Sequence, residues 1–251
     1  GVRIRSALVG YGFTRYEPDQ LDNYVRESPL IYRFADADHY SFSMAALSRY
    51  LGVTEAALFE RVKEKNSNMR DRTLINFCGK AGTFPTESYM RIFLGDINQE
   101  LLEKFCKGKI VIVGATSPQL HDEFPTPFKV LSGPEIHASV INMIINTLYI
   151  HEPGVPANII LLLVSVLITT YLVTRFTPYI SLMLMAVLYG VFLYAAVFVF
   201  QSGRIAVSII NPLWVGLFTY TGNIIYRAVT EGKDKKKYKN IFQRYVSKQV
   251  V

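Results

Sequence analysis

Histidine and carboxylate side chains are the residues of this sequence best suited to chemistry. His121-Asp122 lies in an expected loop, and Glu135-x-His137 lies in the first turn of the helix expected to follow. If the loop folds over that helix N-terminus, the groups converge where α/β sheets place ligands and where an anion is favoured. The candidate ligand-binding residues are Thr116, His121, Asp122, Thr126, Glu135 and His137.

A structural role is the alternative for the same residues. Asp122 and His137 could tie the loop to the helix by hydrogen bonds, and we favour this account. All four histidines, which also include His39 and His151, precede the apolar runs and invite a metal-binding or pH-sensing interpretation. None has the dense spacing of metal ligands, so we predict no metal site.

Nucleotide binding and catalysis are not predicted for this segment. Gly108-Lys109 has no glycine-rich cradle before it, and Gly79-Lys80 is followed by Ala81, so neither pair belongs to a phosphate-binding loop. We therefore expect no catalytic residue and no cofactor here.

Two cysteines, Cys78 and Cys106, are candidates for a disulfide. An oxidising compartment permits the bond. Because Cys78 follows an expected strand and Cys106 ends an expected helix, they could be near or far apart. Two buried free thiols are the preferred alternative.

Alternating helix and strand signals predict an α/β layer fold for the first part of the chain. Lys109–Gly114 is a β-branched run bounded by glycine, which is typical of a strand buried on both faces. Gly133-Pro134 begins a helix with proline in its first turn. The apolar stripe of that helix is Ile136, Val140, Ile141, Ile144, Ile145 and Leu148. The other expected elements are helices at 41–50, 54–65 and 98–105 and a strand at 73–77.

Three uncharged apolar runs follow, at 157–174, 180–200 and 205–226. Each is long enough to cross about 30 Å of hydrocarbon as a helix. Ala186 and Gly190 in the second run offer a weak face for close helix association. The runs predict a multi-pass membrane protein.

The basic residues predict its orientation. Residues 1–156 contain 17 basic and 18 acidic side chains, whereas residues 227–251 contain eight basic and two acidic ones. Basic flanks stay cytoplasmic, so residues 1–156 should lie outside and 227–251 inside. The net charge of +7 resides in this tail and in Arg175 and Arg204, which argues against nucleic-acid binding.

Three ordered motifs carry a family resemblance: Gly108–Thr116, Asp122–Pro127 and Gly133–Ala138. Together they resemble the C-terminal half of a CHASE2 domain, an extracytoplasmic sensor module of bacterial signalling receptors. Asp22–Arg26 and Ile75–Phe77 add weaker matches, although Asn23-Tyr24 departs from the acidic-glycine pair of the family. The resemblance implies that the first half of the module and a membrane helix precede Gly1.

The basic tail narrows the expected output. Residues 236–251 resemble the entry to a class III adenylate/guanylate cyclase domain. The predicted signal-coupling residues are Phe242, Arg244, Tyr245, Val246 and Ser247. The resemblance implies a cyclase beyond Val251 that uses Mg²⁺ and ATP in a homodimer. A histidine or serine/threonine kinase output, or a membrane anchor without signalling, is the alternative.

The prediction is therefore a receptor fragment in the bacterial inner membrane. It comprises an extracytoplasmic sensor domain at 1–156 with an unknown ligand, three transmembrane helices at 157–226, and a cytoplasmic linker helix at 227–251.

Overall fold

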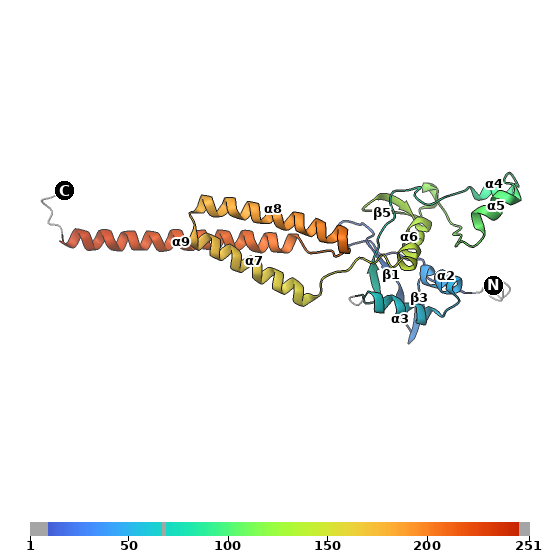
Figure 1. Cartoon of the computed structure of the whole chain (residues 1–251), viewed down its shortest axis with the longest axis horizontal. Coiled ribbons are helices and arrows are strands. Elements are labelled where there is room, and N and C mark those ends of the chain that lie inside the picture. Colours follow the sequence, from blue (N-terminus) through green and yellow to red (C-terminus); the bar gives the residue numbers. More distant parts are fainter. Residues whose placement is uncertain (1–9, 67–68, 246–251) are drawn as a thin grey trace. The chain divides into compact units, whose positions relative to one another are not determined.

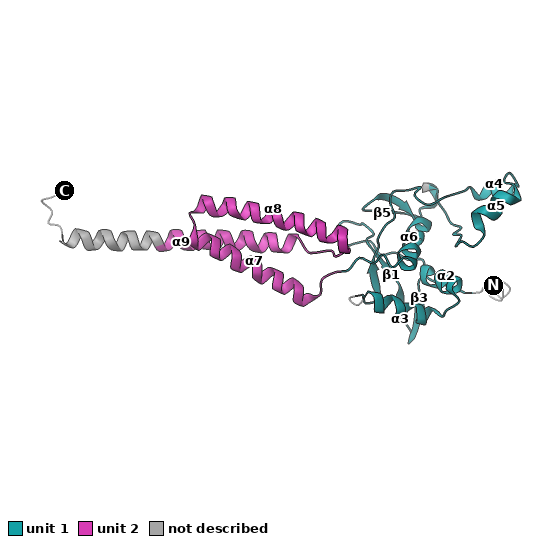
Figure 2. Cartoon of the chain, in the orientation of Figure 1, with its two compact units in different colours: residues 1–151 teal, residues 152–251 magenta. Residues whose placement is uncertain are grey.

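A computed structural model of the chain describes residues 10–66 and 69–245. The chain forms two compact units, residues 1–151 and 152–251 (Figure 2). We call them unit 1 and unit 2 and describe each by itself.

Unit 1 combines short strands with helices around one core (Figure 1). Its strands form three separate antiparallel pairs, β1 with β4, β2 with β3, and β5 with β6. The mixed α/β class agrees with the sequence, but no continuous layer forms among the described residues. The strands are β1 (Glu27–Pro29), β2 (Ile31–Phe34), β3 (Ala37–Tyr40), β4 (Arg72–Leu74), β5 (Glu123–Thr126) and β6 (Lys129–Ser132).

The helices of unit 1 begin and end largely where capping residues predict. The Ser41 and Thr54 side chains accept hydrogen bonds from backbone N–H groups at the starts of α2 and α3. Gly52 ends α2 in a left-handed conformation. Asn98 caps α5 in the same way. The helices are α2 (Phe42–Leu51), α3 (Glu55–Lys65), α4 (Tyr89–Phe93), α5 (Gln99–Cys106) and α6 (Gly133–Ile145), with a 3₁₀ turn, η1, at Pro118–Leu120.

Helix α6 supplies the centre of the core. Ile136 and Val140 are fully buried, and Ile141 and Ile144 nearly so. Two residues depart from the predicted stripe: Ile145 is 46% exposed at the last position of the helix, and Leu148 packs against the core from beyond its end. The stripe therefore binds α6 to the core over most of its length.

The strand predicted at Lys109–Gly114 does not form. Ile110 and Ile112 pack against the core, but Val111 and Val113 are 55% and 71% exposed. Residues 109–114 form no strand, and the prediction that both faces of this segment are buried was wrong. Alternate residues of this run face the core, which leaves its other face exposed, and none of the described strands pairs with it.

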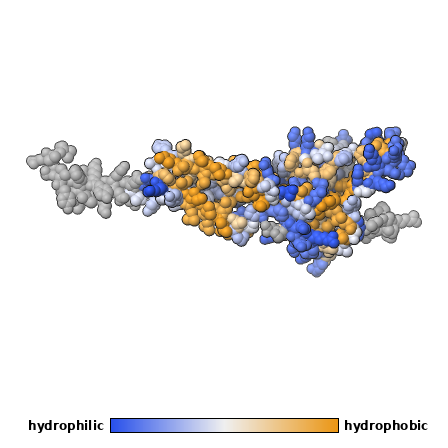
Figure 3. Space-filling model, in the orientation of Figure 1, coloured by the Kyte–Doolittle hydropathy of each residue, from blue (hydrophilic) through white to orange (hydrophobic). Residues whose placement is uncertain are grey.

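Unit 2 consists of α7 (Val155–Arg175), α8 (Pro178–Gly203) and α9 (Ile210–Tyr245). In the described residues, α7 and α8 are the helices long and apolar enough to cross a membrane. Figure 3 shows hydrophobic residues covering most of the visible face of these helices. Both helices begin and end within a few residues of the predicted runs.

The third apolar run was predicted as a helix from residue 205, but α9 begins only at Ile210. Pro212 explains this start, because proline is favoured in a first helical turn. The helix then continues without a break to Tyr245, so no boundary separates it from the predicted linker at residue 227. Phe242, Arg244 and Tyr245 belong to α9, whereas Val246 and Ser247 lie outside the described residues.

A polar junction joins the three helices of unit 2. The Ser165 hydroxyl of α7 and the Tyr189 hydroxyl of α8 lie 3.0 Å apart, and each donates to the Pro212 carbonyl oxygen of α9 at 3.1 Å. In an apolar environment these groups have few other partners. The junction thus fixes the start of α9 against its neighbours.

Gly216 makes room for this junction. A Cβ at Gly216 would lie 1.5 Å from the Tyr189 hydroxyl oxygen, whereas a Cβ at Gly190 would meet no atom within 4 Å. We expect Gly216→Ala to displace Tyr189 and to destabilise unit 2 by about 1–3 kcal/mol, as overpacking does. The free energy of unfolding, measured in mixed micelles, should decrease by this amount.

Gly190→Ala is the matched control and should be neutral or stabilising, because alanine favours helix. Equal unfolding midpoints for the two variants would contradict the junction.

Candidate functional site

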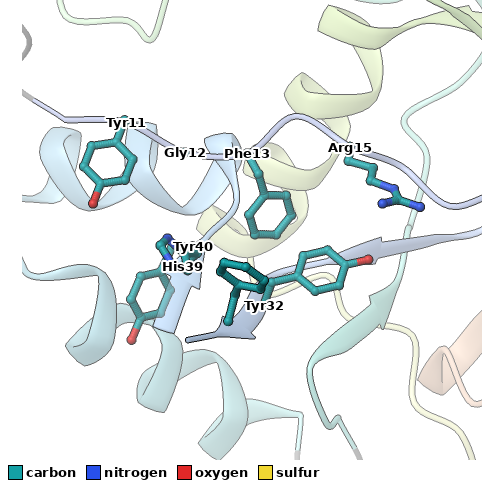
Figure 4. Close-up of a pocket in the computed structure, with 8 residues that line it drawn as sticks. Tyr11, Gly12, Phe13, Arg15, Tyr32, His39 and Tyr40 are labelled. Atoms are coloured by element: carbon teal, nitrogen blue, oxygen red, sulfur yellow. The ribbon is translucent and has the colours of Figure 1, made fainter. Parts of the chain in front are cut away.

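Unit 1 contains an aromatic pocket between its N-terminal segment and the β2–β3 hairpin. The cavity measures about 440 Å³, within the range of small-molecule sites. Figure 4 shows the rings of Tyr11 and Phe13 descending from the segment toward Tyr32 and Tyr40 of the hairpin. The lining residues are Tyr11, Gly12, Phe13, Arg15, Tyr32, Phe34, His39 and Tyr40.

Backbone hydrogen bonds hold the N-terminal segment in place. The Phe13 N–H donates to the Tyr40 carbonyl oxygen at 3.2 Å, and the Phe42 N–H donates to the Phe13 carbonyl oxygen at 2.7 Å. Gly12 permits this approach, because a Cβ there would lie 2.7 Å from the backbone N and Cα of Phe42. One wall of the pocket is therefore fixed to the start of α2.

The hairpin supplies the other wall. The Phe13 and Tyr32 rings make an edge-to-face contact with centroids 4.9 Å apart. Tyr40 contacts Phe59 of α3 at 6.3 Å, and burial raises the pKa of its hydroxyl. In contrast, Tyr11 is 81% and Phe34 75% exposed. The pocket thus has a supported floor and two aromatic rings that are open to solvent.

Arg15 is the only lining residue with a formal charge at neutral pH. Glu17 lies beside the pocket and accepts from the Tyr32 hydroxyl and from Arg72, while Arg15 Nε is 3.8 Å away from Glu17 Oε1. The Tyr32 hydrogen bond and the cation of Arg72 lower the pKa of Glu17, so the carboxylate stays ionised. One carboxylate therefore serves two guanidinium groups, and Arg15 is the more distant.

A buried imidazole connects this segment with α6. His137 Nδ1 lies 2.7 Å from the Tyr16 hydroxyl oxygen and 2.8 Å from the Ser43 hydroxyl oxygen. The His137 ring also contacts the Phe42 ring, with centroids 5.0 Å apart. Burial lowers the pKa of His137 to about 4, so the ring is neutral at physiological pH and can accept a hydroxyl hydrogen.

Three of the predicted ligand-binding residues have internal partners. His137 faces Tyr16 and Ser43, as described. Glu135 accepts from the Gly82 N–H at 2.6 Å and from the Ser132 N–H at 3.5 Å, which closes a capping box. The buried Thr126 hydroxyl donates to the Lys129 carbonyl oxygen within the β5–β6 turn. These contacts support the structural account, with partners other than those expected.

The other three predicted residues lie in the segment that precedes β5. Thr116 and His121 are exposed, and Asp122 is half-buried. The Asp122 carbonyl oxygen accepts from the Gly133 N–H at 2.9 Å, and its carboxylate lies close to the Gly133 Cα. In the described part of the chain, no hydrogen bond joins the side chains of any two of the six residues. A ligand role for Thr116, His121 and Asp122 stays a prediction.

Neither a metal site nor a disulfide occurs among the described residues. Cys78 and Cys106 are free thiols, and Cys78 is exposed, so the expected burial of both was wrong. The Asn142 amide donates to Cys78 Sγ at 3.2 Å. This contact places Cys78 beside α6.

The Asp22–Arg26 match forms an ion-paired turn. Arg26 donates to both Asp22 carboxylate oxygens, at 2.9 and 2.5 Å, and lowers the pKa of Asp22 to about 2. Asn23 has a φ of 62°, a left-handed conformation that asparagine tolerates better than most residues. Asn23 therefore supplies the left-handed position of this turn.

Sequence reasoning missed the aromatic pocket. Its lining residues fall in two stretches, residues 11–15 and residues 32–40, and Tyr11 and Phe13 alternate in the first as Tyr32 and Phe34 do in the second. The alternation of aromatic residues in each stretch could have indicated one aromatic face. Nothing in the sequence indicates that the two stretches meet.

Comparison with known proteins supports a family assignment. The model of the CHASE2 domain matches residues 4–197. The match includes the aromatic pocket, the α6 core and α7, and it extends into α8. No curated protein and no solved structure matches the chain.

Gly12→Ala tests the support of the pocket wall. Its Cβ would collide with the Phe42 backbone, which cannot move without loss of the α2 N-terminus. We expect destabilisation of unit 1 by about 1–3 kcal/mol and faster amide hydrogen exchange at Phe42. Gly10→Ala is the control, since its Cβ would meet only the flexible Arg49 side chain. Equal exchange in both variants would contradict the close approach.

His137 predicts a specific pH dependence of stability. Its pKa is about 4 in the folded state and about 6.5 when unfolded, so the unfolded state binds more protons between these values. The contribution of His137 to the free energy of unfolding should be fully present above pH 6.5, and about 3 kcal/mol of it should be lost as the pH falls to 4. The thermal midpoint of the purified protein in detergent measures this.

In His137→Gln the midpoint at pH 7.5 should be lower and its decrease toward pH 4 smaller. His121→Gln, at an exposed position, is the control. If His137→Gln keeps the full acid sensitivity, another group is responsible.

Proposed function

The chain belongs to the CHASE2 family, and from this premise we propose that it is the sensor and transmembrane relay of a receptor cyclase. CHASE2 is an extracytoplasmic sensor domain found in signalling receptors. Together with the apolar helices α7 and α8, the family indicates a membrane protein. The proposal adds the third span, the orientation and the output.

The observation that carries the relay is the continuity of α9. Its 36 residues correspond to about 54 Å of helix, whereas hydrocarbon needs about 30 Å. We take its first half as the third span of a protein in the bacterial inner membrane. Unit 1 would then lie outside the cytoplasm and the basic tail inside it, because basic flanks stay cytoplasmic. A rigid helix then extends from the membrane toward the output domain.

Contacts with α7 and α8 fasten the membrane half of α9. The Ser165–Tyr189–Pro212 junction holds its start. Farther along, the Tyr220 hydroxyl donates to the Pro178 carbonyl oxygen at 2.9 Å. Arg227 donates to the Phe176 carbonyl oxygen at 3.0 Å. This contact lies at the C-terminus of α7, where the helix dipole stabilises a positive charge. A displacement of α7 or α8 would therefore move α9 with it.

Within unit 1, contacts lead from the pocket to α6. The Phe13 carbonyl oxygen accepts a hydrogen bond from the Phe42 N–H, and the Phe42 ring contacts the His137 ring on α6. The chain from the end of α6 to the start of α7 is short, at residues 146–154. A ligand that moves the Phe13 segment would thus act on the helix that precedes the first span.

The cyclase output rests on the sequence from Phe242 to Ser247 and on its resemblance to the entry of class III cyclases. The catalytic domain, with Mg²⁺ and ATP, would follow Val251 and would act as a homodimer. The predicted role of Phe242, Arg244, Tyr245, Val246 and Ser247 is to transmit the position of α9 to that dimer.

Insertions into α9 of the full-length protein test the relay. Two residues inserted between Thr230 and Glu231 rotate the distal helix by about 200°, whereas seven residues restore its phase to within about 20°. We expect the two-residue insertion to change cyclic nucleotide formation at least fivefold, and the seven-residue insertion to leave it within twofold.

Membrane vesicles containing the full-length protein, ATP and Mg²⁺ provide the assay. Equal activity of both insertion variants would contradict transmission through helix phase. A wild-type protein that forms no cyclic nucleotide and instead autophosphorylates would replace the cyclase with a kinase output.

A further inference from the structure

We propose that the aromatic pocket of unit 1 is the ligand site of this sensor and binds a small aromatic carboxylate. This inference rests on the proposed sensor function and names the class of ligand. The size of the pocket, its rings and its charge favour this class of ligand.

The walls select a planar apolar group. A cavity of about 440 Å³ accommodates a one- or two-ring molecule. Aromatic side chains favour offset or edge-to-face contacts with a bound ring. Tyr11 and Phe34 are 81% and 75% exposed, which is unusual for rings that border the same cavity. A bound ring would remove them from water.

The charge at the pocket edge favours an anionic ligand. Among the lining residues Arg15 carries the permanent charge, and none of them is a carboxylate. Its side chain is 75% exposed, and Glu17, its nearest carboxylate, also pairs with Arg72. Arg15 thus retains free donors at the pocket edge. A guanidinium group binds a carboxylate through two parallel hydrogen bonds.

An aromatic cage for a quaternary ammonium ion is the competing interpretation of the same rings. The position of Arg15 opposes it, because a bound cation would be repelled by the guanidinium group. Figure 4 shows Tyr11 and Arg15 on opposite sides of Phe13. The ring of the ligand would lie against the aromatic walls, and its carboxylate would extend toward Arg15.

Binding to the full chain in detergent micelles tests the proposal by isothermal titration. Phenylacetate and indole-3-acetate are the probes, phenylacetamide is the neutral analogue, and benzyltrimethylammonium is the cation. Empty micelles measure partition into detergent. We expect saturable binding of at least one carboxylate, and at least tenfold weaker binding of the amide.

Two variants locate the site. Arg15→Gln should weaken carboxylate binding at least tenfold, and Phe34→Ala at least threefold. Arg33→Gln is the matched control, because Arg33 is 79% exposed on the same hairpin, pairs with Asp38 and does not line the pocket. It should bind within twofold of the wild type.

The absence of saturable carboxylate binding, equal binding of amide and carboxylate, or tighter binding of the cation would overturn the proposal. Equal losses in Arg15→Gln and Arg33→Gln would also overturn it. Because the titration needs no signalling output, it separates the two hypotheses. A carboxylate that binds as expected but leaves cyclic nucleotide formation unchanged would support the site and contradict the relay.

Discussion

Unit 1 depends on the buried contacts of one imidazole. His137 projects from α6 and lies against Tyr16 of the N-terminal segment and Ser43 and Phe42 of α2. Segments more than 90 residues apart in the sequence thus meet at one neutral ring. Protonation of this ring would place an uncompensated charge in the core, which is why its pKa is low. The same contacts hold the segment that forms one wall of the pocket.

Two glycines allow the close contacts on which each unit relies. Gly12 lets the N-terminal segment approach the Phe42 backbone, and Gly216 leaves space for the Tyr189 hydroxyl. At Gly12 the neighbouring atoms are backbone atoms of Phe42, whereas at Gly216 the neighbour is the Tyr189 side chain, which is held by its hydrogen bond to Pro212. Small residues at these positions are therefore steric requirements. In unit 2 this space permits a polar junction among apolar helices, which have little other directional contact.

Local signals predicted many elements well. The helices predicted at 41–50, 54–65 and 98–105 all form, and the first predicted residue of each, Ser41, Thr54 and Asn98, caps its helix, because a capping side chain acts on its own first turn. The buried stripe of α6 and the apolar helices α7 and α8 followed from periodicity and composition. The strand at Lys109–Gly114 failed, since strands need a partner that a local pattern cannot supply. The third apolar run failed in part, because Pro212 delays the start of α9.

By itself the sequence determined the two long apolar helices, the starts of three helices of unit 1, the mixed α/β class and the resemblance to CHASE2, because each depends on neighbouring residues or on ordered motifs. Only the tertiary structure decided which side chains meet. It gave His137 the partners Tyr16 and Ser43, turned Glu135 toward Gly82, and gathered Tyr11, Phe13 and Phe34 around one cavity. The physical reason is that a pocket is formed by contacts between distant segments, and the path of the chain between them fixes those contacts.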